Sequence, residues 1–139
     1  TYRIFSRLGK PTFEKDMVWW TRRDLNIDAM RNGAAFLLGQ HDFTSFRAAE
    51  CQANSPIRTL DRLDIETFPL IGGGQEIRFF VEARSFLHHQ VRNMVGTLVQ
   101  VGLGKWNPER VRTALLAKDR RQGGITAPAS GLSLTRVYY

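Results

Sequence analysis

The sequence predicts an α+β fold, a ferredoxin-like (split βαβ) antiparallel sheet with helices on one face. Three observations lead to this prediction. Strand-like segments alternate along the chain with segments whose apolar residues have helical spacing. A run of three glycines separates two of the strand-like segments, as in a hairpin. Hydrophobic residues make up 42% of the 139 residues, which supports a single domain spanning residues 1–139.

The first part of the predicted order is one strand followed by one helix. Residues 2–6 alternate between apolar and polar side chains, which is typical of a half-buried strand. Asn26 is a suitable N-cap for a helix that runs through Leu38 and is closed by Gly39. We expect residues 40–56 to form a long polar loop, and such a loop in a compact domain is usually functional.

The second part begins with the hairpin and ends with a strand. Residues 58–68 and 76–83 have strand patterns, and Gly72 to Gly74 form the turn between them. A closing strand is indicated by three apolar residues near the end of the chain: Leu132, Leu134 and Val137.

Two helices are predicted between the hairpin and the closing strand. The first covers residues 87–101, and the second begins at Asn107 and ends near Lys118. Gly96 costs the first helix about 1 kcal/mol relative to alanine, which indicates a close approach by another segment. Arg92 on the same helix could hold a carboxylate or a phosphate, but the pattern alone favours a side chain that simply extends to water.

The charge balance favours a polyanionic partner. Lys and Arg number 20 against 13 acidic residues, a net charge of +7, and we place nucleic acid ahead of a merely basic domain. The single cysteine, Cys51, cannot form an internal disulfide, which favours a reducing, cytoplasmic location. No apolar run reaches the roughly 20 residues that span a bilayer, so no membrane partner is expected. The chain starts within a strand pattern, so we expect it to be cut from a longer protein.

No pattern calls for a metal or a cofactor. His88 and His89 are adjacent, so on a helix they would point about 100° apart, and His41 is distant in sequence. The triple glycine lacks the spacing of a phosphate-binding loop. We interpret His88 and His89 as helix-start residues near RNA or a protein partner.

The loop after the first helix is a candidate RNA-binding segment. Phe43 and Phe46 could stack on bases while Arg47 contacts phosphate. The alternative is that the two phenylalanines anchor the loop in the core. Arg58, His88 and His89 complete the set of candidate RNA contacts.

Three motifs resemble those of one enzyme family. They contain His41-Asp42-Phe43-Thr44-Ser45-Phe46-Arg47, Phe86-Leu87-His88-His89-Gln90-Val91-Arg92-Asn93 and Ala127-Pro128-Ala129-Ser130-Gly131-Leu132. In order and spacing they resemble the TruA-type tRNA pseudouridine synthases, and the resemblance extends from about Tyr2 to Tyr138.

The resemblance implies an activity and a site. The family isomerises uridine to pseudouridine in the tRNA anticodon stem-loop, without cofactor or metal, through an aspartate nucleophile. By their positions in the motifs, Arg92 would pair with the catalytic aspartate and Leu132 would line the uracil pocket. Tyr2 matches the first tyrosine of the family's Arg-x-Tyr-x-Tyr strand and would pack on the target base, although Ile4 stands where the family has its second tyrosine.

The chain departs from the family pattern at the nucleophile. The family's aspartate lies in a Gly-Arg-Thr-Asp segment upstream of the tyrosine, and no aspartate here has that context. We therefore expect this chain to be the C-terminal half of the two-part fold and inactive alone. The implied partners are tRNA, the N-terminal half of the same protein and, in the full-length form, a second copy in a homodimer.

The competing interpretation is a free-standing, RRM-like RNA-binding module without catalysis. Its support is the shared strand and helix order and the aromatic run Phe79-Phe80-Val81. A cleft that holds Tyr2, Arg92 and Leu132 would favour the synthase, whereas aromatic rings on an open sheet face would favour the module.

Overall fold

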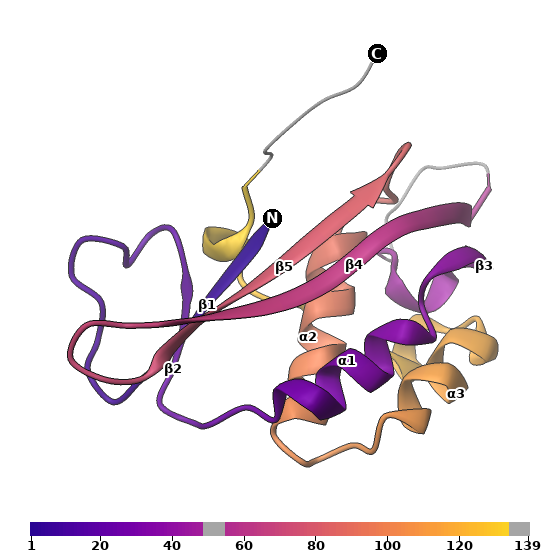
Figure 1. The fold of residues 1–139 in the computed structure, drawn as a ribbon. Helices are drawn as coiled ribbons and strands as arrows, with labels where there is room; N and C mark the ends of the chain where they lie inside the picture. The colour runs from indigo at the N-terminus through magenta and orange to yellow at the C-terminus, as the bar shows by residue number, and fades with distance from the viewer. Residues whose placement is uncertain (49–54, 134–139) are drawn as a thin grey trace.

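A computed structural model describes residues 1–48 and 55–133 (Figure 1). The described part combines one sheet with helices packed against it, so the α+β prediction is confirmed. Short 3-10 helices lie at Thr44–Phe46, Arg120–Gln122 and Ala129–Gly131. The strands and α-helices are β1 (Tyr2–Ser6), β2 (Trp19–Thr21), α1 (Ile27–Ala35), β3 (Gly39–Asp42), β4 (Ile57–Pro69), β5 (Gln75–Ala83), α2 (Gln90–Gly102) and α3 (Glu109–Ala117).

The sheet has the strand order β2-β1-β5-β4-β3. The pairs β1–β5, β5–β4 and β4–β3 are antiparallel, but β1 and β2 are parallel, so the expectation of a purely antiparallel sheet was wrong. Figure 1 shows the three α-helices on one side of the sheet. The side chains of Ile65, Ile77 and Phe79 on β4 and β5 are buried in the same core cluster as Met94 and Leu98 of α2.

Two strands were not predicted. The strand β2 has three residues, which is too short for alternation to be recognised. The strand β3 lies inside the predicted loop 40–56, and its sequence Gly-Gln-His-Asp is polar. It is a strand because its backbone pairs with β4, in the register Gly39 with Leu60 through Asp42 with Ile57. The side chains of these four residues do not alternate between apolar and polar, so their pattern does not indicate the pairing.

The helix ends follow local chemistry. The Asn26 side chain accepts a hydrogen bond from the Ala29 N–H at 3.0 Å, so the predicted N-cap of α1 is confirmed. The helix ends at Ala35 rather than Leu38, and Gly39 has a φ of +92°, which glycine adopts without strain. In α3 the predicted cap also forms, because Asn107 Oδ1 accepts from the Arg110 N–H at 3.0 Å.

The helix α2 starts three residues later than predicted. His89 has a φ of +61° and precedes the first turn, so neither His88 nor His89 is helical. A tight turn replaces the predicted first turn, because the Gln90 side chain accepts from the Leu87 N–H at 2.9 Å. The buried face of α2 includes Met94, Val95 and Leu98, as its apolar spacing predicted.

The remaining predictions concern the hairpin and the chain end. Gly72, Gly73 and Gly74 all have positive φ angles and form the turn between β4 and β5, as predicted. Leu132 bridges Tyr2 in an antiparallel manner at the edge of β1. The other two residues of the predicted closing strand, Leu134 and Val137, lie outside the described residues, as does Cys51. No helix in residues 1–48 and 55–133 is long and apolar enough to cross a membrane.

Candidate active site

The segment from Ala127 to Leu132 brings together three residues that are distant in sequence. Arg92, in the first turn of α2, donates from Nε to the Ala127 carbonyl at 2.8 Å. The hydroxyl of Tyr2, the first residue of β1, donates to the Pro128 carbonyl at 2.6 Å. Leu132 then pairs with Tyr2 through its backbone. The motif near the chain end therefore organises the site by its backbone, which side-chain patterns alone could not reveal.

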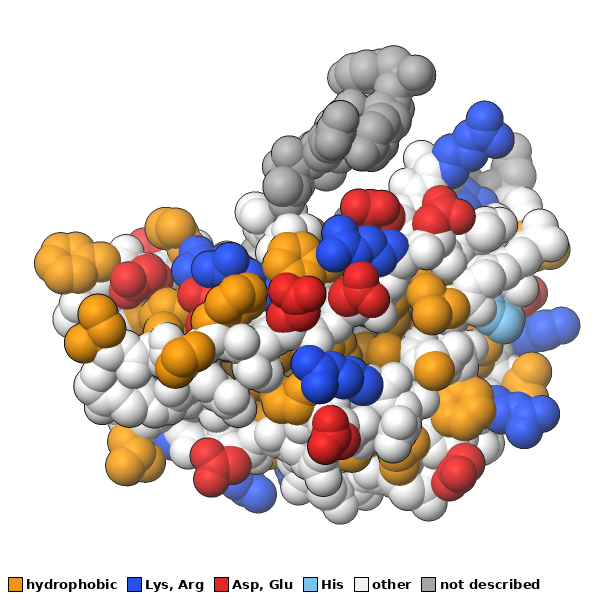
Figure 2. All heavy atoms as spheres, viewed as in Figure 1, with side chains coloured by type: hydrophobic (Ala, Val, Ile, Leu, Met, Phe, Trp, Pro, Cys, Tyr) orange, Lys and Arg blue, Asp and Glu red, His pale blue; other side chains and the backbone are white. Residues whose placement is uncertain are grey.

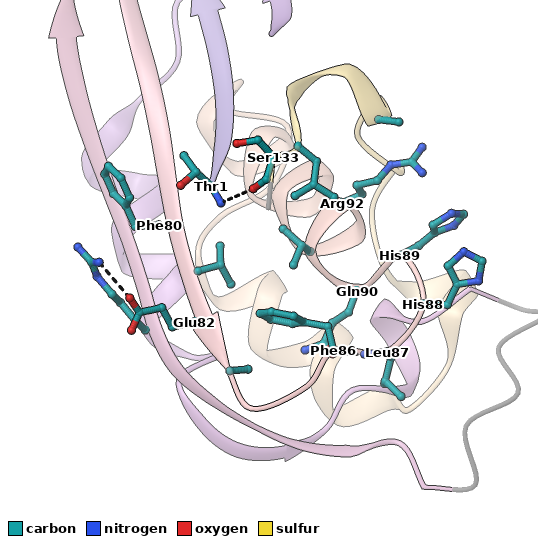
Figure 3. Close-up of a pocket in the computed structure, with 16 residues that line it drawn as sticks. Thr1, Phe80, Glu82, Phe86, Leu87, His88, His89, Gln90, Arg92 and Ser133 are labelled. Atoms are coloured by element: carbon teal, nitrogen blue, oxygen red, sulfur yellow. Dashed lines mark hydrogen bonds and ion pairs between the residues drawn. The ribbon is translucent and has the colours of Figure 1, made fainter. Parts of the chain in front are cut away.

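A cavity of about 810 Å³ lies beside these residues (Figure 3). Arg92 and Leu132 both line it, and Phe86, Leu87 and Val91 supply much of its apolar wall. Figure 3 shows Arg92, His88 and His89 together at one side of the cavity, with Phe80 and Thr1 across from them. The other lining residues are Arg62, Val81, Glu82, Ala83, Gln90, Ala129 and Ser133. The arrangement is an apolar pocket with Arg92 and two histidines at one side, suited to a flat apolar ring that carries polar edges.

The Arg92 guanidinium is fixed at one edge and open at the other. Its Nε–H is committed to Ala127, and within residues 1–48 and 55–133 the terminal nitrogens Nη1 and Nη2 have no acceptor. Two parallel N–H groups on a planar guanidinium match the two oxygens of a carboxylate or phosphate. The contact with Ala127 fixes the direction of this fork before any ligand binds.

Tyr2 lies behind the site rather than in the cavity wall. Its side chain is 0% exposed, and its ring packs edge-on against Trp19 with 6.5 Å between centroids. Burial raises the pKa of the Tyr2 phenol, and the positive charge of Arg92 opposes this rise only in part. The phenol is therefore a neutral hydrogen-bond donor at physiological pH. In this conformation the ring has no free face for a base, contrary to the packing that the resemblance implied.

The predicted RNA-binding phenylalanines are core residues. Phe43 and Phe46 are both 0% exposed, and their ring centroids lie 6.4 Å apart. Stacking on bases was therefore the wrong interpretation for these two rings, and the anchoring alternative is correct. They hold the short 3-10 helix Thr44–Phe46 against the core, which leaves Arg47 half-buried at the surface.

The remaining candidate RNA contacts are spread over two places. His88 and His89 stack with 4.0 Å between their ring centroids at the cavity rim. The backbone links Arg47 to this rim, because the Ala48 N–H donates to the His88 carbonyl at 2.9 Å. Arg58 lies at the start of β4, where its Nη1 donates to the Ser55 and Ile57 carbonyls. The described residues contain no group of three or more His, Cys, Asp or Glu side chains that could hold a metal ion.

The open face of the sheet carries aromatic rings, but guanidinium groups cover them. Arg62 lies 5.0 Å from the centroid of the Phe80 ring, and Arg78 lies 4.4 Å from that of Phe68. Arg62 is also paired with Asp64 and Glu82. Figure 2 shows acidic and basic side chains intermingled over β4 and β5. This face offers neither free rings nor a uniformly basic surface, which counts against the RRM-like interpretation.

A polar network that the sequence pattern did not predict surrounds Asn93, the residue after Arg92. Asn93 is 1% exposed on the buried side of α2, between the buried polar residues Gln90 and Thr97. Its Oδ1 accepts from the Thr126 hydroxyl at 2.6 Å and from Arg120 Nη2 at 3.0 Å, and its Nδ2 donates to the Phe46 carbonyl at 2.8 Å. An asparagine within a run of core positions was the available signal, because a buried amide requires polar partners.

The comparison with known proteins is consistent with this geometry. A family described as tRNA pseudouridine synthase matches residues 34–139, more than half of the chain. This chain belongs to the tRNA pseudouridine synthase family. The matched range includes Arg92, Leu132 and the segment that connects them.

Individual members of the family are similar over nearly the whole chain. The tRNA pseudouridine synthase A of Bartonella quintana (strain Toulouse) is 50% identical, covering 99% of this chain and 54% of that protein. The synthase A of Paramagnetospirillum magneticum is 54% identical, with 99% and 52% covered. That of Rhodospirillum rubrum is 51% identical, with 99% and 48% covered. The chain thus spans about half the length of these tRNA pseudouridine synthases.

Proposed function

We propose that this chain forms one wall of the active site of a tRNA pseudouridine synthase, which isomerises uridine to pseudouridine in the tRNA anticodon stem-loop. The observation that carries the proposal is the Arg92 guanidinium beside an apolar cavity that Leu132 also lines. It is fixed through Nε and has no acceptor at Nη1 or Nη2 among the described residues. A basic fork next to an apolar pocket suits a carboxylate nucleophile beside a pyrimidine ring.

The reaction rearranges bonds without losing atoms. An aspartate attacks the nucleotide, the glycosidic C–N bond breaks and the uracil turns. A C–C bond then forms between C5 of the uracil and the same ribose, and the bond to the aspartate is released. C5 loses its proton and N1 gains one, so the product is an isomer of the substrate. The target nucleotide must first leave its base stack to reach such a pocket. The apolar wall around Leu132 would let the detached ring turn without strong polar contacts and would keep water away from it.

In this proposal Arg92 keeps the nucleophile ionised and oriented. Burial in an apolar pocket raises the pKa of a carboxyl group, whereas a guanidinium in contact lowers it. The Nη1 and Nη2 groups of Arg92 would bind both carboxylate oxygens and direct one of them at the nucleotide. Tyr2 supports the arrangement from behind, because it holds Pro128 through its hydroxyl.

We further propose that the nucleophile arrives with the other half of the protein, docked at the cavity. The ladder between β1 and β5 ends where Tyr2 pairs with Phe79. From Phe80 to Ala83, β5 pairs with β4 on one side, and in the described residues it has no strand on the other side. Those same residues line the cavity. An extended segment could complete the sheet here and place a carboxylate near Arg92.

The remaining partners follow from charge and from the family. The net charge of +7 supports tRNA as the polyanionic partner, and His88 and His89 at the cavity are candidate contacts to it. We propose that the complete protein acts in the cytoplasm as a homodimer. Its mass in solution, measured by light scattering, tests the dimer directly.

The activity can be tested with a chimera. The first half of the Paramagnetospirillum magneticum relative would be joined to residues 1–139 and assayed by tritium release from uridine-labelled tRNA. We expect turnover by the chimera and none by residues 1–139 alone. Turnover by the isolated chain would contradict the assignment of the nucleophile to the other half. A folded chimera that binds tRNA but releases no tritium would contradict the proposed function.

A further inference from the structure

Two hydrogen bonds to one residue determine where Arg92 points. The Ala127 carbonyl accepts from Arg92 Nε at 2.8 Å, and the Ala127 N–H donates to the Arg92 carbonyl at 3.0 Å. Ala127 is 0% exposed, so water does not compete for either bond. The position of the guanidinium is therefore only as well defined as the position of Ala127.

Ala127 belongs to a segment without regular structure, which α2 holds in place. The Gly124 N–H donates to the Thr97 hydroxyl at 2.9 Å, and the Thr126 hydroxyl donates to Asn93 Oδ1 at 2.6 Å. Between these contacts Gly96 lets the Ile125 backbone lie directly on the helix. Asn93, Gly96 and Thr97 share one face of α2, because residues three and four apart are neighbours on a helix.

The hydrogen bond between Thr126 and Asn93 is nearest to Ala127 and is reinforced from the side. Arg120 Nη2 donates to Asn93 Oδ1 at 3.0 Å and to the Thr126 hydroxyl at 3.1 Å. Asn93 in turn is fixed by its own donation to the Phe46 carbonyl. Thr126 is thus the only side chain in the segment 123–127 with a hydrogen bond to Asn93 among the described residues.

We propose that Thr126 is a positioning residue for Arg92. It acts through Asn93 and Arg120 to fix Ala127, and Ala127 fixes the guanidinium. The proposal rests on the proposed function, because it assigns Thr126 a part in the same reaction. Thr126 itself is exposed and does not line the cavity, so it reaches the nucleotide only through Arg92.

The experiment compares Thr126→Val with Thr126→Ser. Valine has nearly the shape of threonine but no hydroxyl, whereas serine keeps the hydroxyl. In the chimera, Thr126→Val should lower kcat about tenfold with KM unchanged, because a small misplacement of a reacting group reduces the rate of the chemical step. Thr126→Ser should restore most of the rate. Thr113→Val is the matched control, since Thr113 is an exposed threonine on α3 whose hydroxyl bonds the Glu109 carbonyl.

A second measurement tests the positioning without any activity. In isotope-labelled residues 1–139, the Nε–H signal of Arg92 should exchange with water about tenfold faster in Thr126→Val than in Thr126→Ser or Thr113→Val. Unchanged exchange and unchanged kcat in Thr126→Val would overturn the proposal, as would equal losses in the valine and serine variants. If exchange responds as expected while Arg92→Ala leaves the chimera fully active, the proposed function fails and the positioning of Arg92 by Thr126 stands.

Discussion

Gly131 lies directly against the ring of Tyr2. A Cβ on residue 131 would come within 2.6 Å of Cε1 and Cζ of Tyr2 and within 2.8 Å of the Arg3 carbonyl oxygen. The close approach lets the end of the motif Ala127 to Leu132 pass over β1 and bridge Tyr2. A glycine is required here for space, and its role can be tested by adding one carbon.

The substitution Gly131→Ala should therefore destabilise the chain. Neither the buried ring nor the β1 backbone can move away freely, so we expect a loss of about 1–3 kcal/mol in the free energy of unfolding. Urea denaturation followed by circular dichroism measures it. Gly9→Ala is the control, because nothing lies within 4 Å of a Cβ at that position. Equal stability of the two variants would show that the loop over Tyr2 is free to move.

Gly96 permits a second close approach, between α2 and the segment before Ala127. Alanine is favoured over glycine in a helix by about 1 kcal/mol, but a Cβ at residue 96 would overlap the carbonyl group of Ile125. Because both clashing groups are tied to backbone, we expect Gly96→Ala to cost about 2 kcal/mol net of the helix gain.

The matched control for Gly96→Ala is Gly33→Ala in α1. The nearest atoms to a Cβ at residue 33 are side-chain methyl groups of Val111 and Leu98, at 3.1 and 3.2 Å, and the nearest backbone atom given is Pro108 Cα at 3.9 Å, an ordinary contact distance. The methyl groups can shift, so the loss should be smaller than at residue 96. Thermal and urea unfolding of both variants show which of them loses more free energy of unfolding. Greater damage from Gly33→Ala would contradict the packing of residues 123–127 on α2.

The sequence predicted those features of the structure that require a particular type of side chain. The Asn26 cap, the hairpin at Gly72 to Gly74 and the close approach at Gly96 were all predicted, because each requires a particular residue type. The strand β3 was missed, because its pairing uses only backbone groups. The candidate RNA contacts Phe43 and Phe46 are core residues, and the sequence does not distinguish the two roles, since an aromatic ring in a loop suits both a core and an RNA surface.

In the candidate active site, too, the residue types were predictable and the backbone contacts were not. The resemblance singled out Arg92, Tyr2 and Leu132, and the structure places Arg92 and Leu132 on one cavity with Tyr2 behind them. What joins them is a series of hydrogen bonds to the Ala127 and Pro128 carbonyls. Every residue, proline included, has the same backbone carbonyl, so no sequence pattern indicates which carbonyl accepts.

Glu76 makes the stability of the sheet depend on pH. It is 4% exposed on β5 and is hydrogen-bonded to Arg3 and Arg78, which face each other across β1 and β5. Burial raises the pKa of its carboxyl, but the hydrogen bonds and charges of the two arginines outweigh this and hold it below its ordinary value of 4.5. The carboxylate therefore stabilises the fold above about pH 4.5, and this contribution is lost as the pH falls through the folded-state pKa.

The substitution Glu76→Gln should lower the free energy of unfolding at neutral pH. It should also make that free energy fall less steeply between about pH 5 and pH 3 than in the original chain. Two arginines that face each other without their carboxylate account for the first effect. Urea denaturation across this pH range measures both effects. Asp16→Asn, in the exposed loop between β1 and β2, should leave the pH profile unchanged. A Glu76→Gln profile parallel to that of the original chain would contradict the assignment.

RNA binding by the isolated chain should be weak and should depend on salt. Each contacted phosphate releases counterions, so log affinity should fall linearly with log salt concentration, with a slope of about 0.7–0.9 per phosphate. Arg47→Ala should reduce the slope by about one contact if Arg47 binds phosphate near the His88 rim. Arg112→Ala, exposed on α3 and outside the cavity lining, is the control. Fluorescence anisotropy with an anticodon stem-loop measures the slope, and an affinity independent of salt would rule out phosphate contacts.

Arg92 gives the sharpest test, because its two proposed properties, charge and geometry, can be removed separately. In the chimera, Arg92→Ala removes both, and the nucleophile loses the cation that keeps it ionised and aligned. Arg92→Lys returns the charge, but an ammonium cannot donate to Ala127 and bind two carboxylate oxygens with one rigid plane.

We expect the single-turnover rate to fall about 100- to 1,000-fold in Arg92→Ala and to recover little in Arg92→Lys. Affinity for tRNA should change less than about twofold in both, because Arg92 is proposed to contact the nucleophile rather than a phosphate. Arg112→Ala should match the unmodified chimera in rate and affinity. A lysine variant that works nearly as well as arginine would mean that charge alone suffices, and the fork geometry fixed by Ala127 would then have no part in the chemistry.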